Sequence, residues 1–284
     1  MTVIGCSAPR RRGAAHPISV PPLGAVACCS PRLLTCAVLM MSPDSGHHGA
    51  YQYDTVWFSD DGGKTYTTSK NASGQPIQIF GQDEIALAET PDGGVITSTR
   101  NEDWHRGYPK GAHDPTKINC NCRGVSRSTD GGTTFAPPKP DTTLVGPVCQ
   151  ATMLSVATSA AGDGGGGGGG GGQGGRAIFH ANPGHGTDKE SKSPPNGRAT
   201  GTVRRSVDGG KTWEASVDLN GKEAYSYSCL TAVPQLGYVG LAYETVLPGS
   251  AIQPSASANN IVFTLVPQNF TGATVLRDAA DLKS

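Results

Sequence analysis

The stretch Ser206-Val207-Asp208-Gly209-Gly210-Lys211-Thr212-Trp213 is one of three copies of a single phrase in this sequence. The other copies begin at Ser59 and at Ser128, and all three have the form S-x-D-x-G-x-T-aromatic. The Asp can accept bonds from backbone N–H groups two or three residues further on, and Gly supplies the positive φ that tight turns need. A phrase that recurs in this way is typical of a fold built from copies of one β unit.

Short strand-like runs surround these turns. One run precedes each copy, and the aromatic residue that closes the phrase can pack beneath the turn. Elsewhere the chain alternates runs of about five residues with turn signals, and no helical periodicity of useful length is present. The expected strands are 84–89, 94–99, 152–157, 177–181, 230–233, 239–243 and 261–266. The pattern predicts an all-β fold, most simply a β-propeller made of four-stranded sheets around a central channel.

Composition narrows the class of protein. The chain has 284 residues, of which 36% are hydrophobic, and its formal net charge is zero, as in a soluble globular protein with an ordinary core. A neutral chain gives no sign of nucleic acid as a partner. The eight cysteines contain no C-x-x-C pair, so zinc spacing is absent and disulfide pairing stays open. The repeated turns lack the Glu that a calcium loop needs at its twelfth position, so no metal site is predicted.

Several segments depart from the strand pattern. Residues 1–45 read as an atypical, partly disordered leader, and their apolar stretch 33–41 is too short for a transmembrane segment. A buried strand is the favoured interpretation of that stretch, with a targeting segment as the alternative. Residues 161–175 form a glycine-rich insertion that we expect to be disordered, and 182–199 a second mobile loop. The propeller would occupy 46–268, and 269–284 would be a C-terminal tail.

The segments around the three turns carry a family resemblance. From about Tyr53 to Leu265 the sequence resembles the exo-α-sialidases, or neuraminidases, whose Asp box (BNR repeat) has the repeated form described above. The stretch that begins at Glu84 resembles the sialidase strand whose Glu assists the nucleophile. The stretch Ser226 to Ala232 resembles the segment that carries the nucleophilic tyrosine, here Tyr227. The resemblance also matches Arg123 and Arg204, at fixed offsets before two Asp boxes, to arginines that bind the substrate carboxylate.

The chemistry of sialic acid suits these residue types. Its anomeric carbon carries a carboxylate, which a guanidinium can bind through two charge-assisted hydrogen bonds, the role that the resemblance gives to Arg123 and Arg204. A neutral phenol avoids the repulsion that a carboxylate nucleophile would meet, and sialidases are the tyrosine exception among glycosidases. Because an ordinary phenol has a pKa of about 10, Tyr227 needs a nearby base, and Glu84 would accept its proton. No cofactor is implied.

Three further residues receive no role. Arg100 and Glu244 lie in family-like stretches, and Arg205 alternates to the strand face opposite Arg204, where we expect it to meet solvent. Taken singly, each assigned residue could also be an ordinary surface arginine, an exposed carboxylate or a tyrosine that packs on a sheet. Their common order along the chain favours the functional interpretation.

The departures from the family also bear on function. Sialidases have an Arg-Ile-Pro phrase and a loop aspartate that acts as acid/base catalyst, and neither has a match here. About 230 residues at roughly 40 to 50 per blade suffice for four to five blades of a six-bladed propeller. The resemblance therefore implies an incomplete six-bladed propeller with Asp-box hairpins. It implies an exo-α-sialidase, a retaining hydrolase that releases terminal sialic acid from glycoproteins, gangliosides or oligosaccharides. The alternative is a catalytically impaired propeller that binds acidic sugars, and the cellular compartment stays open.

Overall fold

The computed structural model describes most of the chain between residues 53 and 275, together with two earlier strands. The described residues are 27–29, 36–41, 53–61, 64–77, 79–80, 82–101, 118, 120–158, 175–184, 198–213, 215–219, 224–233, 236–246, 260–271 and 273–275. The glycine-rich insertion 161–175 lies outside them except for Gly175, as do most of the leader 1–45, most of the loop 182–199 and the end of the tail 269–284. Every element named in the described part is a β-strand, as the sequence predicts.

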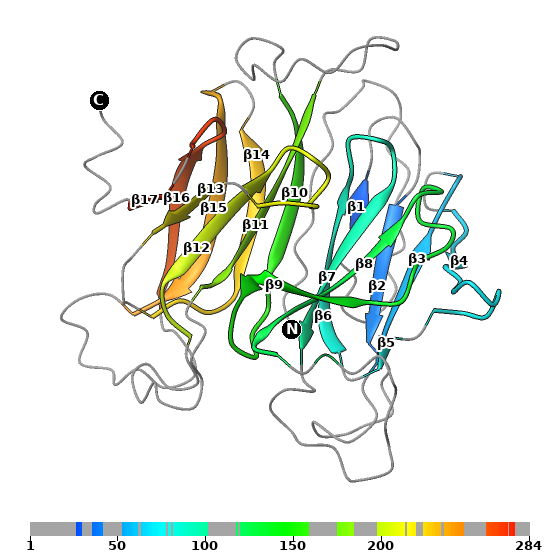
Figure 1. Cartoon of the computed structure of the whole chain (residues 1–284). Coiled ribbons are helices and arrows are strands. Elements are labelled where there is room, and N and C mark those ends of the chain that lie inside the picture. The colour runs from blue at the N-terminus through cyan, green and yellow to red at the C-terminus, as the bar shows by residue number, and fades with distance from the viewer. Residues whose placement is uncertain are drawn as a thin grey trace, which may run out of the picture.

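Four small sheets, almost entirely antiparallel, make up the fold, and they lie side by side from the blue β1–β5 to the orange and red β14–β16 (Figure 1). The first contains β1 (Ala27–Cys29), β2 (Cys36–Met41), β3 (Tyr53–Phe58), β4 (Thr67–Thr68) and β5 (Ile79–Phe80). The second contains β6 (Gln82–Glu89), β7 (Val95–Asn101), β8 (Cys122–Ser128) and β9 (Lys139–Val145).

The third sheet contains β10 (Thr152–Ala157), β11 (Arg176–Pro183), β12 (Gly201–Ser206) and β13 (Ala215–Asp218). It is completed by β17 (Ala273–Val275), which pairs with β13 in parallel. The fourth contains β14 (Ser228–Val233), β15 (Tyr238–Thr245) and β16 (Asn260–Pro267). Among the first strands of the last three sheets, β10 lies next to both β6 and β14.

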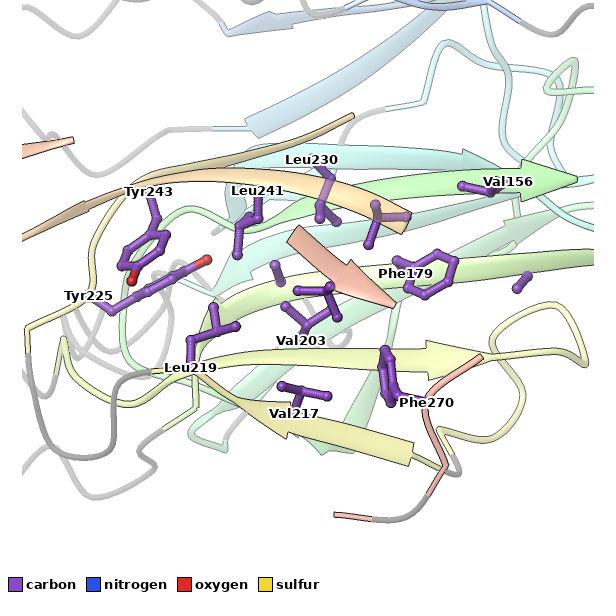
Figure 2. Packing of buried hydrophobic residues seen from close by; sticks show 14 residues of the cluster. Val156, Phe179, Val203, Val217, Leu219, Tyr225, Leu230, Leu241, Tyr243 and Phe270 are labelled. Carbon is purple, nitrogen blue, oxygen red and sulfur yellow. The ribbon is translucent and has the colours of Figure 1, made fainter. Parts of the chain in front are cut away.

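Side-chain alternation explains why the sheets stack face to face. In β6, Ile85 and Leu87 pack toward the first sheet, while Ala86 and Ala88 point the other way, toward the third. Successive strand residues point to opposite faces, so a strand with apolar residues on both faces can fill two cores at once. Figure 2 shows the largest core, between the third and fourth sheets. Its labelled members are Val156, Phe179, Val203, Val217, Leu219, Tyr225, Leu230, Leu241, Tyr243 and Phe270.

The three repeated turns share one hydrogen-bond pattern. Each connects two antiparallel neighbours, namely β3 and β4, β8 and β9, and β12 and β13. The Asp208 carboxylate accepts bonds from the Ser206 hydroxyl at 2.8 Å, the N–H groups of Lys211 and Thr212 at 2.9 Å each, and the Thr212 hydroxyl at 2.7 Å. Asp61 accepts the same four bonds, and Asp130 accepts three of them, from the Ser128 hydroxyl and from the N–H and hydroxyl of Thr134.

The aromatic residue that closes each turn does not always pack as expected. Phe135 is buried in the core between the first two sheets, and Trp213 packs partly against the next core. Tyr66, in contrast, is 44% exposed, so the prediction that this aromatic plugs the turn is wrong for the first copy.

Candidate active site

Tyr227 and Glu84 lie together, although they are 143 positions apart in the chain. Tyr227 directly precedes β14, and Glu84 lies near the start of β6. Both face Arg100 on β7, whose Nη1 donates to Glu84 Oε2 at 2.8 Å and to the Tyr227 hydroxyl at 3.3 Å. The same Arg100 nitrogen thus binds both the carboxylate and the phenol, and the charge of Glu84 acts on the pKa of the phenol. A phenol, a carboxylate and a guanidinium therefore form one contiguous group.

A hairpin with an irregular start brings Glu84 to Arg100. The strands β6 and β7 join through a turn closed by the Thr90 N–H bond to the Gly94 carbonyl at 2.9 Å. Their register slips between Asp83 and Ala86, a β-bulge, and Glu84 within it has a φ of 45°. A non-glycine residue rarely adopts positive φ, and such backbone strain clusters at functional sites. The bulge re-aims the Glu84 side chain away from the regular alternation of the strand.

A second arginine reaches the phenol from a different part of the chain. Arg198 carries its guanidinium carbon 5.7 Å from the centre of the Tyr227 ring, a cation–π distance. Its Nη1 donates to the Ser226 hydroxyl at 3.3 Å and its Nη2 to the Val148 carbonyl at 3.2 Å. Its backbone carbonyl accepts from the Tyr225 N–H at 3.0 Å, so the same segment positions both the arginine and the residues before Tyr227.

Glycine permits a close approach behind this segment. A Cβ at Gly201 would lie 2.1 Å from the ring of Tyr225, which fills the space beside that backbone. The Tyr225 ring is fully buried and stacks on Tyr243 at 5.0 Å between ring centres. This packing holds the chain immediately before Tyr227.

The surroundings keep the phenol protonated in the resting site. Burial raises the pKa of Tyr227 to about 12, and the negative charge of Glu84 adds to the shift, while Arg100 opposes it. A phenol with this pKa is not nucleophilic at neutral pH by itself. It requires a base beside its proton, and the Glu84 carboxylate, bound to the same Arg100 nitrogen as the phenol, is placed for that role.

Arg123 lies close to this group, but its guanidinium is held by the protein. It is 1% exposed, and its Nη1 donates to the Cys149 carbonyl at 2.6 Å and its Nε to the Ser98 hydroxyl at 3.1 Å. Burial lowers the pKa of Arg123 to about 10, and the charge of Glu84 is the largest effect that opposes this. Arg123 is thus near enough to interact with the charge of Glu84, but its guanidinium is buried where the second and third sheets pack together.

Arg204 has different partners from Arg123. Its Nη1 donates to Asn182 Oδ1 at 2.7 Å, and the negative charges that act on it are those of Asp218 and Asp141. The fully buried His180 is the strand partner of Arg204, and its Nε2 lies 3.0 Å from the Ser98 hydroxyl that Arg123 also binds. Arg123, Ser98, His180 and Arg204 therefore form a polar seam between the second and third sheets.

Two arginines lie at the phenol. Arg100 had no role assigned from sequence, and Arg198 was not among the candidates. The turn closed by Thr90 and Gly94 gives only a partial signal for Arg100. Its register, continued without a break, would place residue 100 opposite Glu84, but the bulge pairs Arg100 with Asp83 instead. Arg198 gave no comparable signal, since it ends a stretch that reads as a loop. Its place depends on the isolated bridge between Ala199 and Ala224, a long-range contact.

The remaining unassigned residues are also located. Glu244 adjoins Tyr227 through its backbone N–H, which donates to the Tyr227 carbonyl at 2.9 Å, and its carboxylate accepts from the Tyr227 N–H at 3.4 Å. Arg205 is only 9% exposed, so the expectation that it meets solvent is wrong. The alternation argument fails because both faces of β12 are covered by neighbouring sheets.

The described part of the chain holds no group of three or more His, Cys, Asp or Glu residues suited to a metal. Within the same residues, no helix could cross a membrane. Cys120 and Cys122 are joined as a disulfide, and Cys149 is a buried thiol.

Comparison with known proteins gives consistent results for sequence and fold. No protein-family model matches the sequence. A sialidase of Micromonospora viridifaciens is 29% identical over 205 residues, which are 72% of this chain and 25% of that protein. Among solved structures, the NanB sialidase of Streptococcus pneumoniae matches with a TM-score of 0.55 and 17% identity over 88% of this chain and 33% of its own.

An intramolecular trans-sialidase of Ruminococcus gnavus, solved with oseltamivir carboxylate, matches with a TM-score of 0.54 and 18% identity. That match covers 85% of this chain and 43% of the other. The chain thus spans about a quarter of the curated relative and less than half of either structure. At these identities the structural matches establish a shared fold.

Proposed function

Because sequence and fold relate this chain to the sialidase family, we propose that it carries the nucleophile end of an exo-α-sialidase active site. The proposed reaction is retaining hydrolysis that releases terminal sialic acid from glycoproteins, gangliosides or oligosaccharides. The proposed architecture is an incomplete six-bladed propeller in which the four sheets are blades and the repeated turns are Asp boxes. The observation that carries the proposal is that one nitrogen of Arg100 binds both Glu84 and the Tyr227 phenol.

In this proposal the two guanidiniums beside the phenol bind the substrate carboxylate. Arg100 and Arg198 take the place that the sequence analysis gave to Arg123 and Arg204, because they contact Tyr227. The guanidiniums of Arg123 and Arg204 are held by Cys149 and Asn182. A carboxylate that binds both Arg100 and Arg198 would bring the anomeric carbon, to which it is attached, next to the phenol oxygen.

The chemical step follows from these contacts. The Tyr227 proton moves to the Glu84 carboxylate while the phenol oxygen bonds to the anomeric carbon and the bond from that carbon to the aglycone oxygen breaks. The aglycone leaves as an oxyanion. Water then attacks the same carbon, the bond to Tyr227 breaks, and protonated Glu84 returns its proton to the tyrosine, so that the configuration is retained. The proton that the water loses neutralises the aglycone oxyanion through solvent. Glu84 acts as base in the first half and as acid in the second.

A fluorogenic sialoside with a phenolic leaving group tests this proposal. Such a leaving group departs without protonation, so the assay depends on Tyr227 and Glu84 and needs no separate general acid. We expect the full chain to release the fluorophore and Tyr227→Phe to reduce release by a factor of at least about 100. Tyr238→Phe, a tyrosine on β15 outside the cluster, is the matched control and should retain full activity.

The alternative function is binding of acidic sugars without turnover. The raised pKa of Tyr227 favours it, because a phenol that stays protonated can serve as a hydrogen-bond donor. Sialic acid that binds to the wild-type chain and to Tyr227→Phe, together with no fluorophore release by either, would reject the enzyme and support the binding module.

A further inference from the structure

The residue after Tyr227 is fixed by a side chain from a neighbouring sheet. Gln150, two residues before β10, donates from Nε2 to the Ser228 carbonyl at 3.1 Å, and its Oε1 accepts from the Ser228 N–H at 3.0 Å. One amide thus binds both backbone groups of one residue. Two residues further along each strand, the Thr152 hydroxyl accepts from the Leu230 N–H at 3.3 Å.

These bonds replace a backbone ladder. The strands β10 and β14 lie next to one another but belong to different sheets. Gln150 and Thr152 are two residues apart, and so are Ser228 and Leu230. Each pair therefore lies on one face of its segment, and the two faces meet. A side-chain amide has the same donor and acceptor as a peptide group and can substitute for a strand partner.

The other side of the same segment is held by β15. Ser228 pairs with Tyr243, and the Tyr227 carbonyl accepts from the Glu244 N–H at 2.9 Å. The backbone at Tyr227 is therefore held from β15 directly and from β10 through Ser228. Since the phenol oxygen stands at the far end of its side chain, a small rotation of this backbone moves it away from Glu84 and Arg100.

We propose that Gln150 is a positioning residue, which holds the Tyr227 phenol against Glu84 and Arg100 by binding both backbone groups of Ser228. The effect of Gln150 on turnover rests on the proposed function. Its effect on the position and pKa of the Tyr227 phenol does not. Removal of the amide should disturb the geometry of the reacting group and leave substrate affinity in place.

The test compares three variants of the full chain. Gln150→Met removes both bonds at similar volume, and Thr152→Val loosens the same pair of strands without touching Ser228. Gln268→Met is the matched control, because Gln268 also donates from Nε2 to a strand carbonyl, that of Tyr238, at 3.0 Å and outside the cluster. Stability is measured for each by urea unfolding so that kinetics are compared among folded proteins.

On the fluorogenic sialoside, Gln150→Met should lower kcat by about 10- to 100-fold with KM within about twofold, as expected for a misplaced reacting group. Both Thr152→Val and Gln268→Met should keep kcat within about threefold of wild type. A rise in KM at unchanged kcat would make Gln150 a substrate contact and overturn the proposal.

A second measurement works without turnover. In NMR spectra of protein with ¹³C-labelled tyrosine, the Tyr227 signal is identified by its loss in Tyr227→Phe and then titrated. Gln150→Met should shift this signal and bring the pKa of Tyr227 from about 12 toward its ordinary value as the ring becomes more solvated, whereas Gln268→Met should not. If the wild type is inactive but Gln150→Met still shows this shift, the sialidase proposal is rejected and the positioning role is retained. An unchanged Tyr227 signal in folded Gln150→Met overturns the positioning role whether or not the chain is active.

Discussion

At the scale of single residues, the two arginines beside Tyr227 differ from the two in the seam in what they can bind. Arg198 lies over the ring of Tyr227, while Arg204 is held by Asn182 among the charges of Asp218 and Asp141. We predict that Arg198→Lys raises KM for the sialoside by about 10- to 100-fold, because lysine cannot bind a carboxylate in two places. Arg204→Lys should leave KM within about threefold and act on stability instead.

Steady-state kinetics and urea unfolding of the two variants check this prediction. The opposite pattern, with KM raised by Arg204→Lys alone, would return the carboxylate to the arginine chosen from sequence. The two changes are chemically identical, so the comparison isolates position from residue type.

The same residues show how far the sequence alone can lead. Tyr227 and Glu84 were named from their family-like segments, and in the structure both bind the same nitrogen of Arg100. The arginines were chosen by their offset from the repeated turns, which fixes a place along a strand but not the face or the sheet that the side chain reaches. Arg100 depends on a bulge and Arg198 on a bridge between distant segments, and neither can be read from local pattern.

At the scale of elements, the Asp of each repeated turn stabilises the turn by accepting hydrogen bonds from its backbone and side chains. Burial alone would raise the pKa of Asp208, but bonds from Thr212, Ser206 and Lys211 outweigh it, so the pKa lies below its ordinary value. We predict that Asp208→Ala lowers the free energy of unfolding by about 1–2 kcal/mol at pH 7, from the typical net value of such bonds at a partly exposed site. Asp60→Ala, an exposed aspartate that is not the turn acceptor, should change it by less than about 0.5 kcal/mol.

The Asp208 effect should also depend on pH in a defined direction. A carboxyl whose pKa is lowered in the folded state stabilises above its unfolded pKa of about 3.9, and this stabilisation is lost as the pH falls through the folded pKa. Urea unfolding at pH 7 and at acid pH should therefore show the difference between wild type and Asp208→Ala shrinking toward low pH. A difference that is constant over this range would assign the effect to packing.

Strands and their interfaces were not equally predictable. All seven strands expected from alternation are present, because period-two patterning and turn chemistry act locally. Burial of Arg205 and exposure of Tyr66 were missed, since both depend on which sheet packs against which face. The sequence pattern predicts which residues share a face of a strand. Whether that face is buried depends on how the sheets pack.

The seam between the second and third sheets provides an element-scale prediction. His180 is fully buried, its ring meets Trp213 edge to face at 5.6 Å, and the charges that face it are Arg123 and Arg204. Burial, with the two arginines, holds the pKa of His180 well below 6.5. The unfolded chain therefore binds a proton that the folded protein does not, and stability decreases as the pH falls below about 6.5.

Urea unfolding at pH 7.5, 6.5 and 5.5 checks this sign. We expect the free energy of unfolding of wild type to fall across this range, and the fall to be smaller in His180→Gln, which keeps a hydrogen-bonding group for Ser98 but does not titrate. Equal slopes in the two proteins would exclude His180 as the source. A wild-type slope of opposite sign would contradict the buried neutral ring.

At the scale of the whole molecule, the margin of the fourth sheet is exposed. The eight residues of β16 pair with β15, and among the described residues no strand pairs with the other edge of β16, which lies at the outer side of the fold in Figure 1. The strand carries no charged residue, and Ile261 and Phe263 are 78% and 59% exposed. A long, uncharged apolar edge is a template for pairing with another chain, and a net charge of zero adds no repulsion between copies.

We therefore predict that the chain associates with itself in a concentration-dependent way and that one charge on this edge opposes it. Ile261→Lys should shift the sedimentation profile toward the monomer, because pairing two copies of β16 would then bury or juxtapose like charges. Leu236→Lys makes the same change at another exposed apolar position, 61% exposed and outside β16, and should leave association unchanged. Analytical ultracentrifugation over a range of concentrations distinguishes the two. If both variants dissociate equally, general apolar exposure and not the strand edge drives association, and the fourth sheet would have no special part in it.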